Sequence, residues 1–377
     1  MELSKEILEY IDCHRQKAYD LLLELAQIPA PSNHEEKRAA FCKEWLEKQG
    51  AEGVYIDEAQ NVIYPIGCTQ SNDLVVFMAH SDVVFPDTDP LPLKIEEDRI
   101  YCPGVGDDTA NVVAMMMTAK YIAEKKLKPK NIGMLLVINS CEEGLGNLKG
   151  SRAIMERFGK RVLEFVSLDG QSDSCVHRAV GSRRYRIGVD TEGGHSYAAF
   201  GNRNAIAVLA SMINELYATK VPPLGKTTYN VGAISGGTSV NTIAQHAEML
   251  YEFRSDEREA LDIMQSHLDA VLESYRAKGI RISTELVGER PCGHAVDEEK
   301  MADMIRWAEE AAGRRYGHGL SLHSGSTDCN IPLSMGVPAI CVGCYRGGGA
   351  HTREEYVEIS SLHPGLKFAF DLILHHF

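Results

Sequence analysis

The first half of the chain alternates apolar runs with segments that repeat at helical spacing. The apolar runs cover residues 74–79, 132–139 and 165–168, and polar turns bound each of them. Between the first two runs, residues 108–125 place apolar side chains along one side of a helix. Strand, helix and strand in alternation predict an α/β domain with a mainly parallel sheet that is flanked by helices.

The pattern changes between residues 183 and 290. The order predicted there is a strand at 185–190, a helix at 204–216, strands at 227–234 and 247–253, a helix at 257–278 and a strand at 281–287. This βαββαβ order is the ferredoxin-like arrangement of the α+β class. Because the α/β pattern returns after Pro291, we expect a discontinuous domain, 1–182 and 291–377, with 183–290 as an inserted domain.

Composition narrows the class of protein. The 377 residues carry a formal net charge of −14 and are 44% hydrophobic, which excludes a disordered chain. No tract is rich in Lys and Arg, so we expect no nucleic acid and no membrane as a partner. Residues 1–17 lack an apolar signal core, and no apolar run reaches the ~20 residues of a spanning helix. These features predict a cytoplasmic protein.

Chemically active side chains directly follow all three apolar runs. They are His80 and Asp82, then Glu142 and Glu143, and then Asp169. Because parallel strands present their carboxyl ends at one edge of a sheet, we expect these side chains to meet there. Clustered carboxylates repel one another when buried, and divalent cations are the usual remedy. Asp107, Asp108 and His351, each close to a glycine-rich segment, are further candidates for that edge.

Five short segments carry a resemblance to a known family. They are His80-Ser81-Asp82, Gly106-Asp107-Asp108, Cys141-Glu142-Glu143-Gly144, Ser167-Leu168-Asp169-Gly170 and Ala350-His351-Thr352. In this order they resemble the motifs of the dinuclear-zinc amidohydrolases, the family of aminoacylase, acetylornithine deacetylase, succinyl-diaminopimelate desuccinylase, glutamate carboxypeptidase and peptidase T. The resemblance leans slightly to peptidase T-like members. One departure is Thr109, where the family often has lysine.

The resemblance implies a site for two divalent metal ions. By position, His80 and Asp169 bind one ion, Glu143 and His351 bind the other, and Asp107 bridges both. Three carboxylates against two dications leave one positive charge, which can hold a hydroxide. Zn²⁺ suits these nitrogen and oxygen donors, and Co²⁺ or Mn²⁺ are alternatives.

The resemblance also implies catalytic roles outside the ligand set. Glu142 is the general base, and the Asp82 carboxylate accepts a hydrogen bond from the far nitrogen of His80. The inserted domain is a lid and dimerisation domain, in which His195 polarises the scissile carbonyl group. Asn241 and Arg254 of that domain bind the substrate carboxylate.

Two features stay open at this point. Asp108 has no assigned role, and the favoured interpretation is that its carboxylate caps the helix that follows. The glycine run at 347–349 is equally consistent with a flexible loop and with close backbone approach to a ligand.

These expectations describe a dizinc metallopeptidase or amidohydrolase. A hydroxide that bridges the metal ions attacks an amide bond of a di- or tripeptide, and Glu142 transfers the proton. The alternative is an N-acyl amino acid deacylase, similar to deacetylases or desuccinylases. A non-catalytic metal or peptide binder is a distant alternative, because every expected ligand and base position is filled. The resemblance also implies a homodimer through the inserted domain.

Overall fold

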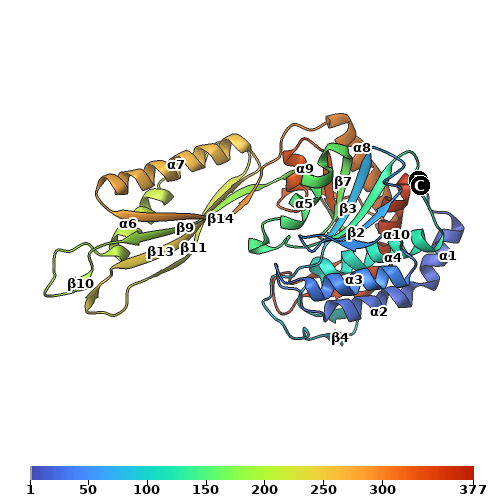
Figure 1. The fold of residues 1–377 in the computed structure, drawn as a ribbon, viewed down its shortest axis with the longest axis horizontal. Coiled ribbons are helices and arrows are strands. Elements are labelled where there is room, and N and C mark those ends of the chain that lie inside the picture. The colour runs from blue at the N-terminus through green and yellow to red at the C-terminus, as the bar shows by residue number, and fades with distance from the viewer. Residues whose placement is uncertain (1) are drawn as a thin grey trace. The chain divides into compact units, whose positions relative to one another are not determined.

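The computed structural model describes residues 2–377, which divide into two compact units (Figure 1). Unit 1 comprises the chain up to Ala179 together with His294–Phe377, and unit 2 comprises Val180–Gly293. Each unit has a hydrophobic core of its own. None of the helices between residues 2 and 377 combines the length and the apolar character that a bilayer-spanning helix requires.

An eight-stranded sheet forms the centre of unit 1, in the order β1-β2-β6-β3-β7-β16-β8-β15. Its strands are β1 (Tyr55–Ile56), β2 (Val62–Ile66), β3 (Leu74–His80), β6 (Gly133–Asn139), β7 (Val162–Leu168), β8 (Ser174–Ala179), β15 (Ser321–Gly325) and β16 (Ala339–Val342). The neighbouring strands β6, β3, β7 and β16 are parallel. Every residue of β3 and β6 is buried, because both faces of the sheet are covered. The predicted α/β class, with a mainly parallel sheet in this domain, is thereby confirmed.

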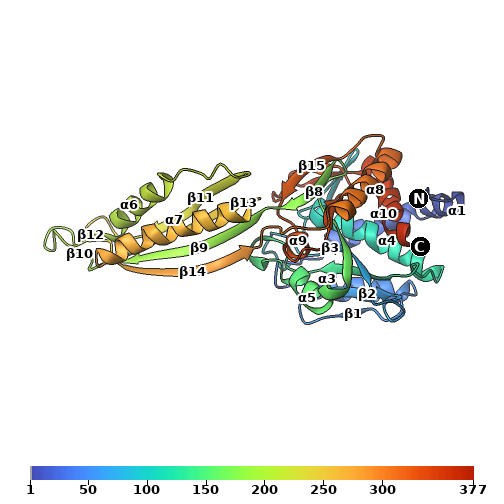
Figure 2. The same ribbon diagram turned by 90° about the horizontal axis from the view of Figure 1, so that it is seen from above.

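Helices flank this sheet (Figure 2). They are α1 (Lys5–Cys13), α2 (Arg15–Ala26), α3 (Glu36–Lys48), α4 (Asn111–Glu124), α5 (Lys149–Phe158), α8 (Glu298–Tyr316), α9 (Asn330–Ser334) and α10 (Ile359–Ile373). The chain moves from β3 to β6 through α4 and then back past β3 to β7 through α5. Right-handed crossovers in opposite directions place these two helices on opposite faces of the sheet.

A smaller sheet in unit 1 joins two loops that are distant in the sequence. It contains β4 (Lys94–Glu96), β5 (Arg99–Tyr101), β17 (Gly347–Gly348) and β18 (Tyr356–Glu358), and β18 pairs with β5. The segment before β18 therefore lies beside the segment after β5. A Cβ atom at Gly347 would lie 2.1 Å from the Tyr356 carbonyl oxygen, so glycine at this position permits a close backbone approach within this sheet.

Unit 2 has the βαββαβ element order. The elements are β9 (Gly181–Asp190), α6 (Ala205–Tyr217), β11 (Thr227–Gly236), β13 (His246–Ser255), α7 (Arg258–Ala277) and β14 (Arg281–Arg290), with a short pair, β10 (Gly194–His195) and β12 (Thr242–Ile243). The four long strands form an antiparallel sheet in the order β11-β13-β9-β14. Alternate residues of β13 are buried, since α6 and α7 pack against this strand.

Candidate metal centre

The ends of three parallel strands bring the predicted site residues of unit 1 to one edge of the large sheet. His80 is the last residue of β3, Glu143 follows β6, and Asp169 follows β7. His80 is 1% exposed and Glu143 is 5% exposed. Parallel pairing of β3 with both β6 and β7 places these strand ends side by side.

Asp107 lies between two histidines that come from opposite ends of the chain. It belongs to the irregular helical turn η1 (Val105–Ala110). Its Oδ1 atom is 3.1 Å from Nε2 of His80, and its Oδ2 atom is 3.1 Å from Nε2 of His351. The same His351 nitrogen is 2.9 Å from Oε1 of Glu143. One carboxylate thus faces two imidazole rings, the arrangement expected of a bridging ligand.

Ligand atoms converge in two groups among the described residues. His80, Asp107 and Glu143 form one group, and His80, Asp108 and Asp169 form the other, with the ligand atoms of each group within 4.8 Å of one another. Together with the contacts of His351, these groups gather all five predicted ligands. The assignment of each residue to a particular ion stays a prediction.

Burial of several carboxylates, to which neighbouring negative charges add, dominates the electrostatics of this edge. Burial raises the pKa of Asp169 well above its usual value, and the nearby charge of Asp107 adds to the shift. Burial raises the pKa of Glu143 to about 7, although the hydrogen bond with His351 opposes this shift. Hydrogen bonds with Asp107 and Glu143 raise the pKa of His351 to about 10. Positive charge therefore stabilises this cluster, and imidazole and carboxylate donors suit Zn²⁺, Co²⁺ or Mn²⁺.

Comparison with known proteins decides the family. The model of peptidase family M20/M25/M40 matches residues 76–375. The chain belongs to this family. The predicted family is confirmed, and M20 proteins are metal-dependent hydrolases that include peptidases and desuccinylases.

Three relatives illustrate the range of the M20 family around this chain. A succinyl-diaminopimelate desuccinylase from Corynebacterium glutamicum is 24% identical, over 90% of this chain and 91% of its own length. A tripeptidase from Staphylococcus aureus has a TM-score of 0.77 and 21% identity, and the match covers 95% of this chain and 97% of the tripeptidase. Aminopeptidase PepT from Bacillus cereus has a TM-score of 0.73 and 20% identity, with coverage of 95% and 98%.

Asp82 contacts neighbouring site residues with its backbone oxygen as well as with its carboxylate, whereas the sequence predicts a contact of the carboxylate alone. Nδ1 of His80 lies 3.1 Å from the Asp82 backbone oxygen and 3.5 Å from its carboxylate oxygen Oδ1, so the main chain makes the shorter contact. The carboxylate accepts hydrogen bonds from the backbone N–H groups of Glu142 at 3.0 Å and Glu143 at 2.9 Å. Ser32 donates a further hydrogen bond at 2.6 Å. Asp82 therefore holds His80 and both glutamates.

The interpretation of Asp108 as a helix cap is wrong. Helix α4 begins at Asn111, its N-cap position is Ala110, and no side chain caps it. The fully buried Asp108 carboxylate instead accepts hydrogen bonds from the backbone N–H of His80 at 2.9 Å and from the Asn111 side chain at 2.6 Å. It holds the end of β3 beside η1, which a reading of local sequence cannot reveal.

Glu142 is buried at the same edge, with 5% of its surface exposed. Its negative charge contributes to the raised pKa values of Asp169 and Asp328. The side chain therefore lies among the carboxylates of the site.

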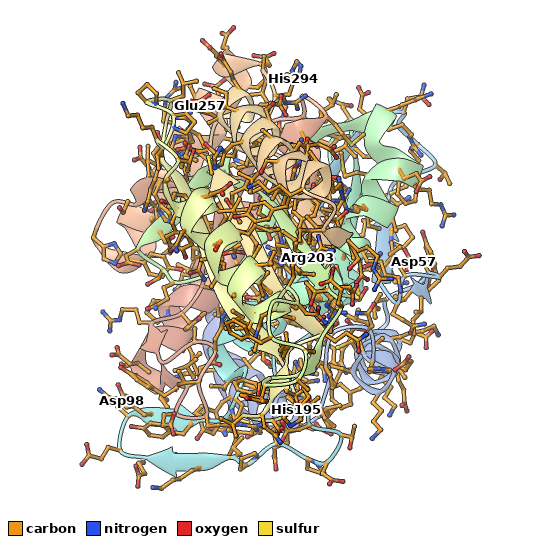
Figure 3. The ribbon with its side chains drawn as sticks, turned by 90° about the vertical axis from the view of Figure 1, so that its left-hand side faces the viewer. Asp57, Asp98, His195, Arg203, Glu257 and His294 are labelled. Carbon is orange, nitrogen blue, oxygen red and sulfur yellow. The ribbon has the colours of Figure 1, made fainter. Side chains whose placement is uncertain are left out.

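The three predicted substrate-contacting residues lie in unit 2. His195 is exposed, and its Nδ1 atom accepts hydrogen bonds from the backbone N–H groups of Tyr197 and Ala198 at 3.2 and 3.3 Å, in the loop before α6 (Figure 3). Asn241 Oδ1 accepts a hydrogen bond from Ser239 at 2.5 Å. Arg254 donates from Nε and Nη2 to the two carboxylate oxygens of Glu252, at 3.0 and 3.1 Å, so its fork already has a carboxylate partner.

Two buried acids near the site are absent from the predicted set. Glu355, 2% exposed, accepts hydrogen bonds from the backbone N–H groups of Gly104, Gly106 and Asp107. Asp328 is fully buried, and its Oδ2 atom accepts a hydrogen bond from Asn139 at 2.6 Å. Neither follows an apolar run, the signal that identified the other acids. Burial of a charged residue is the distinguishing feature of both, and it is visible only in the folded chain.

Proposed function

We propose that this M20 protein is a metal-dependent hydrolase that cleaves an amide bond of a short peptide, with Glu142 as general base. The observation that carries the proposal is the Asp107 carboxylate, whose two oxygens each face a histidine at 3.1 Å. Such sharing is the arrangement of a two-metal site, and the buried Glu142 adjoins it.

The chain's own residues have distinct roles in this proposal. His80 and Asp169 would hold one divalent cation, Glu143 and His351 the other, and Asp107 both. When bound, two Zn²⁺ ions would polarise the amide carbonyl group and activate a water molecule as the nucleophile.

Glu142 is the proposed proton-transfer residue. A carboxylate at this buried edge can take a proton from the attacking water and pass it to the leaving amine. The hydrogen bond from the Glu142 backbone N–H to Asp82 fixes the main chain at this position. The Glu142 side chain therefore extends from a main chain that is held in place.

The tautomer of His195 supports its proposed role at the substrate carbonyl. Because Nδ1 accepts two backbone hydrogen bonds, the neutral ring carries its proton on Nε2. An Nε2–H group can donate to a carbonyl oxygen and stabilise the developing negative charge. Asn241 and Arg254 are proposed to bind the substrate carboxylate, which for Arg254 requires displacement of Glu252 from its fork.

The substrate class has two candidates. The similar tripeptidase and aminopeptidase structures favour a di- or tripeptide. The similar succinyl-diaminopimelate desuccinylase favours an N-acyl amino acid. We place the peptide first, in keeping with the slight leaning of the sequence resemblance to peptidase T-like members.

A substrate panel tests the proposal directly. The purified protein, loaded in turn with Zn²⁺, Co²⁺ and Mn²⁺, is assayed on di- and tripeptides and on N-acetyl and N-succinyl amino acids. We expect turnover of peptides that is lost on chelation and restored by metal. Turnover of the N-acyl panel alone would favour the deacylase, and metal binding without any turnover would favour a non-catalytic binder.

We also propose a homodimer through unit 2. Its strand β11 is a sheet edge, and Ile234 on this strand is 55% exposed. An exposed edge strand with apolar side chains is a common surface for pairing with a second chain.

A further inference from the structure

The residue Arg38 on α3 is a buried cation beside the metal-ligand segments. It is 1% exposed. Its Nη1 atom donates to the Ser81 carbonyl oxygen at 2.8 Å and to the Thr109 hydroxyl at 3.3 Å. Nε and Nη2 both donate to the Ile28 carbonyl oxygen, at 3.1 and 2.7 Å. One rigid guanidinium group therefore joins the residue after His80 to a residue in the turn that carries Asp107.

Glu355 is a buried carboxyl group that accepts hydrogen bonds from backbone N–H groups of the same turn. Its Oε2 atom accepts from Gly104 at 2.7 Å, and its Oε1 atom accepts from Gly106 at 2.9 Å and Asp107 at 2.8 Å. A carboxyl group whose two oxygens accept from three backbone N–H groups fixes the orientation of those groups, because each bond restrains one N–H direction. Glu355 also stands four residues after His351, so it ties the His351 loop to Asp107.

Thr109 connects the two charged groups. Its hydroxyl accepts from Arg38 and donates to the Gly104 carbonyl oxygen at 2.5 Å, and the Gly104 N–H donates to Glu355. We call Arg38, Thr109 and Glu355 the loop brace. The Glu355 carboxyl group holds the N–H groups of the turn from Gly104 to Thr109, and the Arg38 guanidinium group holds its hydroxyl oxygen.

We propose that the loop brace positions the metal ligands, with Arg38 setting His80 against Asp107 and Glu355 setting Asp107 against His351. These are positioning residues, because they act on the ligands through the main chain and Thr109. The proposal rests on the proposed two-metal function. It explains why two charged side chains are buried here at the cost of their hydration.

Metal affinity is the measurement that separates positioning from ordinary structural support. The variants are Arg38→Met, Arg38→Lys, Thr109→Val and Glu355→Gln. For each, the dissociation constant for Co²⁺ is measured by competition with a chelator, the absorption spectrum of bound Co²⁺ is recorded, and thermal unfolding is followed without metal. Outer groups that orient metal ligands typically contribute 10–100-fold to affinity, so we expect weakening of about that size in Arg38→Met and Glu355→Gln.

Two milder variants, Arg38→Lys and Thr109→Val, show how far metal affinity depends on single hydrogen bonds of the loop brace. Lysine keeps the positive charge of Arg38 but lacks the planar guanidinium group with its several N–H donors. We therefore expect the Co²⁺ affinity of Arg38→Lys to lie between those of the parent and Arg38→Met. Valine matches threonine in shape and removes only the hydroxyl, so Thr109→Val keeps the proposal testable even where Arg38→Met fails to fold. We expect Thr109→Val to weaken Co²⁺ binding and to alter the Co²⁺ spectrum.

Arg161 supplies a matched control. It also donates to backbone carbonyl oxygens, those of Cys68, Ser71 and Asn72, at 2.8 to 2.9 Å. This loop precedes β3, so it lies at the opposite end of a seven-residue strand from His80, roughly 20 Å away. Arg161→Met is expected to lower thermal stability while the affinity for Co²⁺ stays within about twofold of the parent.

Two results would overturn the proposal in distinguishable ways. If the parent binds Co²⁺ and the folded brace variants bind it with the same dissociation constant and spectrum, the positioning role is wrong while the proposed function stands. If the parent itself binds no divalent cation, both the proposed function and the role of the loop brace are wrong.

Discussion

At the scale of single residues, Glu142 and Glu143 are adjacent in sequence and equally buried, but the structure gives them different surroundings. Glu143 belongs to one of the two ligand groups and also contacts His351, whereas Glu142 stands outside both groups. We expect Glu142→Ala to lower kcat by about 10²–10⁴-fold with metal content unchanged, since only proton transfer is lost. Metal analysis and steady-state kinetics on the same preparation check this.

Glu143→Ala is the matched comparison for that prediction. It removes a ligand of the same size and burial one residue away, so the expected loss is in metal content as well as in kcat. A Glu142→Ala protein that turned over substrate at the parent rate would show that another group is the base. Metal loss equal to that of Glu143→Ala would instead make Glu142 a ligand.

Sequence identifies those site residues whose position follows from a strand end. His80, Glu143 and Asp169 are of this kind, because a buried strand fixes where the next side chain emerges. Asp108 and Glu355 are not, since their partners are backbone N–H groups far away in the chain. No local pattern encodes which distant N–H group a carboxylate meets.

At the scale of elements, two glycines inside helices have opposite surroundings. A Cβ atom at Gly365 in α10 would lie 1.5 Å from the Cys344 carbonyl oxygen, whereas a Cβ atom at Gly313 in α8 meets nothing within 4 Å. We expect Gly365→Ala to lower the free energy of unfolding by about 1–3 kcal/mol or more, because the backbone contact must open. Urea denaturation at fixed pH measures this change.

Gly313→Ala is the internal control for the packing argument. Alanine is a better helix former than glycine by about 1 kcal/mol, so this variant should be more stable than the parent. Helix propensity alone predicts stabilisation at both sites. Equal stabilisation by both substitutions would therefore refute the close approach of α10 to Cys344.

Helix α4 shows what element-level patterns miss. The apolar spacing of residues 108–125 predicts a helix with one buried side, but Asn111 to Ala123 are all buried. The helix packs on β3, β6 and β7 and is covered in turn by α10, α2 and α3. The outer cover comes from distant parts of the chain, so the local pattern could not predict it.

At the scale of the whole molecule, the His376 side chain, which is 10% exposed, links stability to pH. Burial lowers the pKa of His376 to about 4, with His375 adding to the shift, and the nearest carboxylate oxygen, on Glu164, is 4.0 Å from its Nε2. The native state thus prefers the neutral ring, whereas an unfolded histidine titrates near 6.5. The contribution of the neutral His376 ring to the unfolding free energy is therefore fully present above about pH 6.5 and is lost as pH falls toward 4.

His376→Phe should remove the pH-dependent part of the unfolding free energy that arises from this histidine. Between pH 7 and pH 5, the parent is expected to lose about 2 kcal/mol more unfolding free energy than the variant, which has no proton to bind at this position. Urea unfolding of both proteins, in chelator at the two pH values, gives the comparison. Parallel losses in the two proteins would mean that His376 is already charged in the native state.

Assembly is the second prediction at this scale. For a homodimer, sedimentation at micromolar concentration should give twice the 41.6 kDa chain mass. Ile234→Lys on the edge strand β11 should shift the protein toward the monomer, whereas Ile95→Lys, 45% exposed on β4 of unit 1, should not. A parent that sediments as a monomer would contradict the proposed dimer.

The sequence by itself determined the order of the main strands and helices, the fold class and the family, because these depend on periodicity and on short motifs that are local in the chain. It also placed the candidate ligands at one sheet edge, since parallel strands share that edge. Only the tertiary structure decided how Asp107 stands between His80 and His351, and which buried charges hold it there. The physical reason is that a charge is buried only where distant groups complete its hydrogen bonds, and those groups become neighbours only on folding.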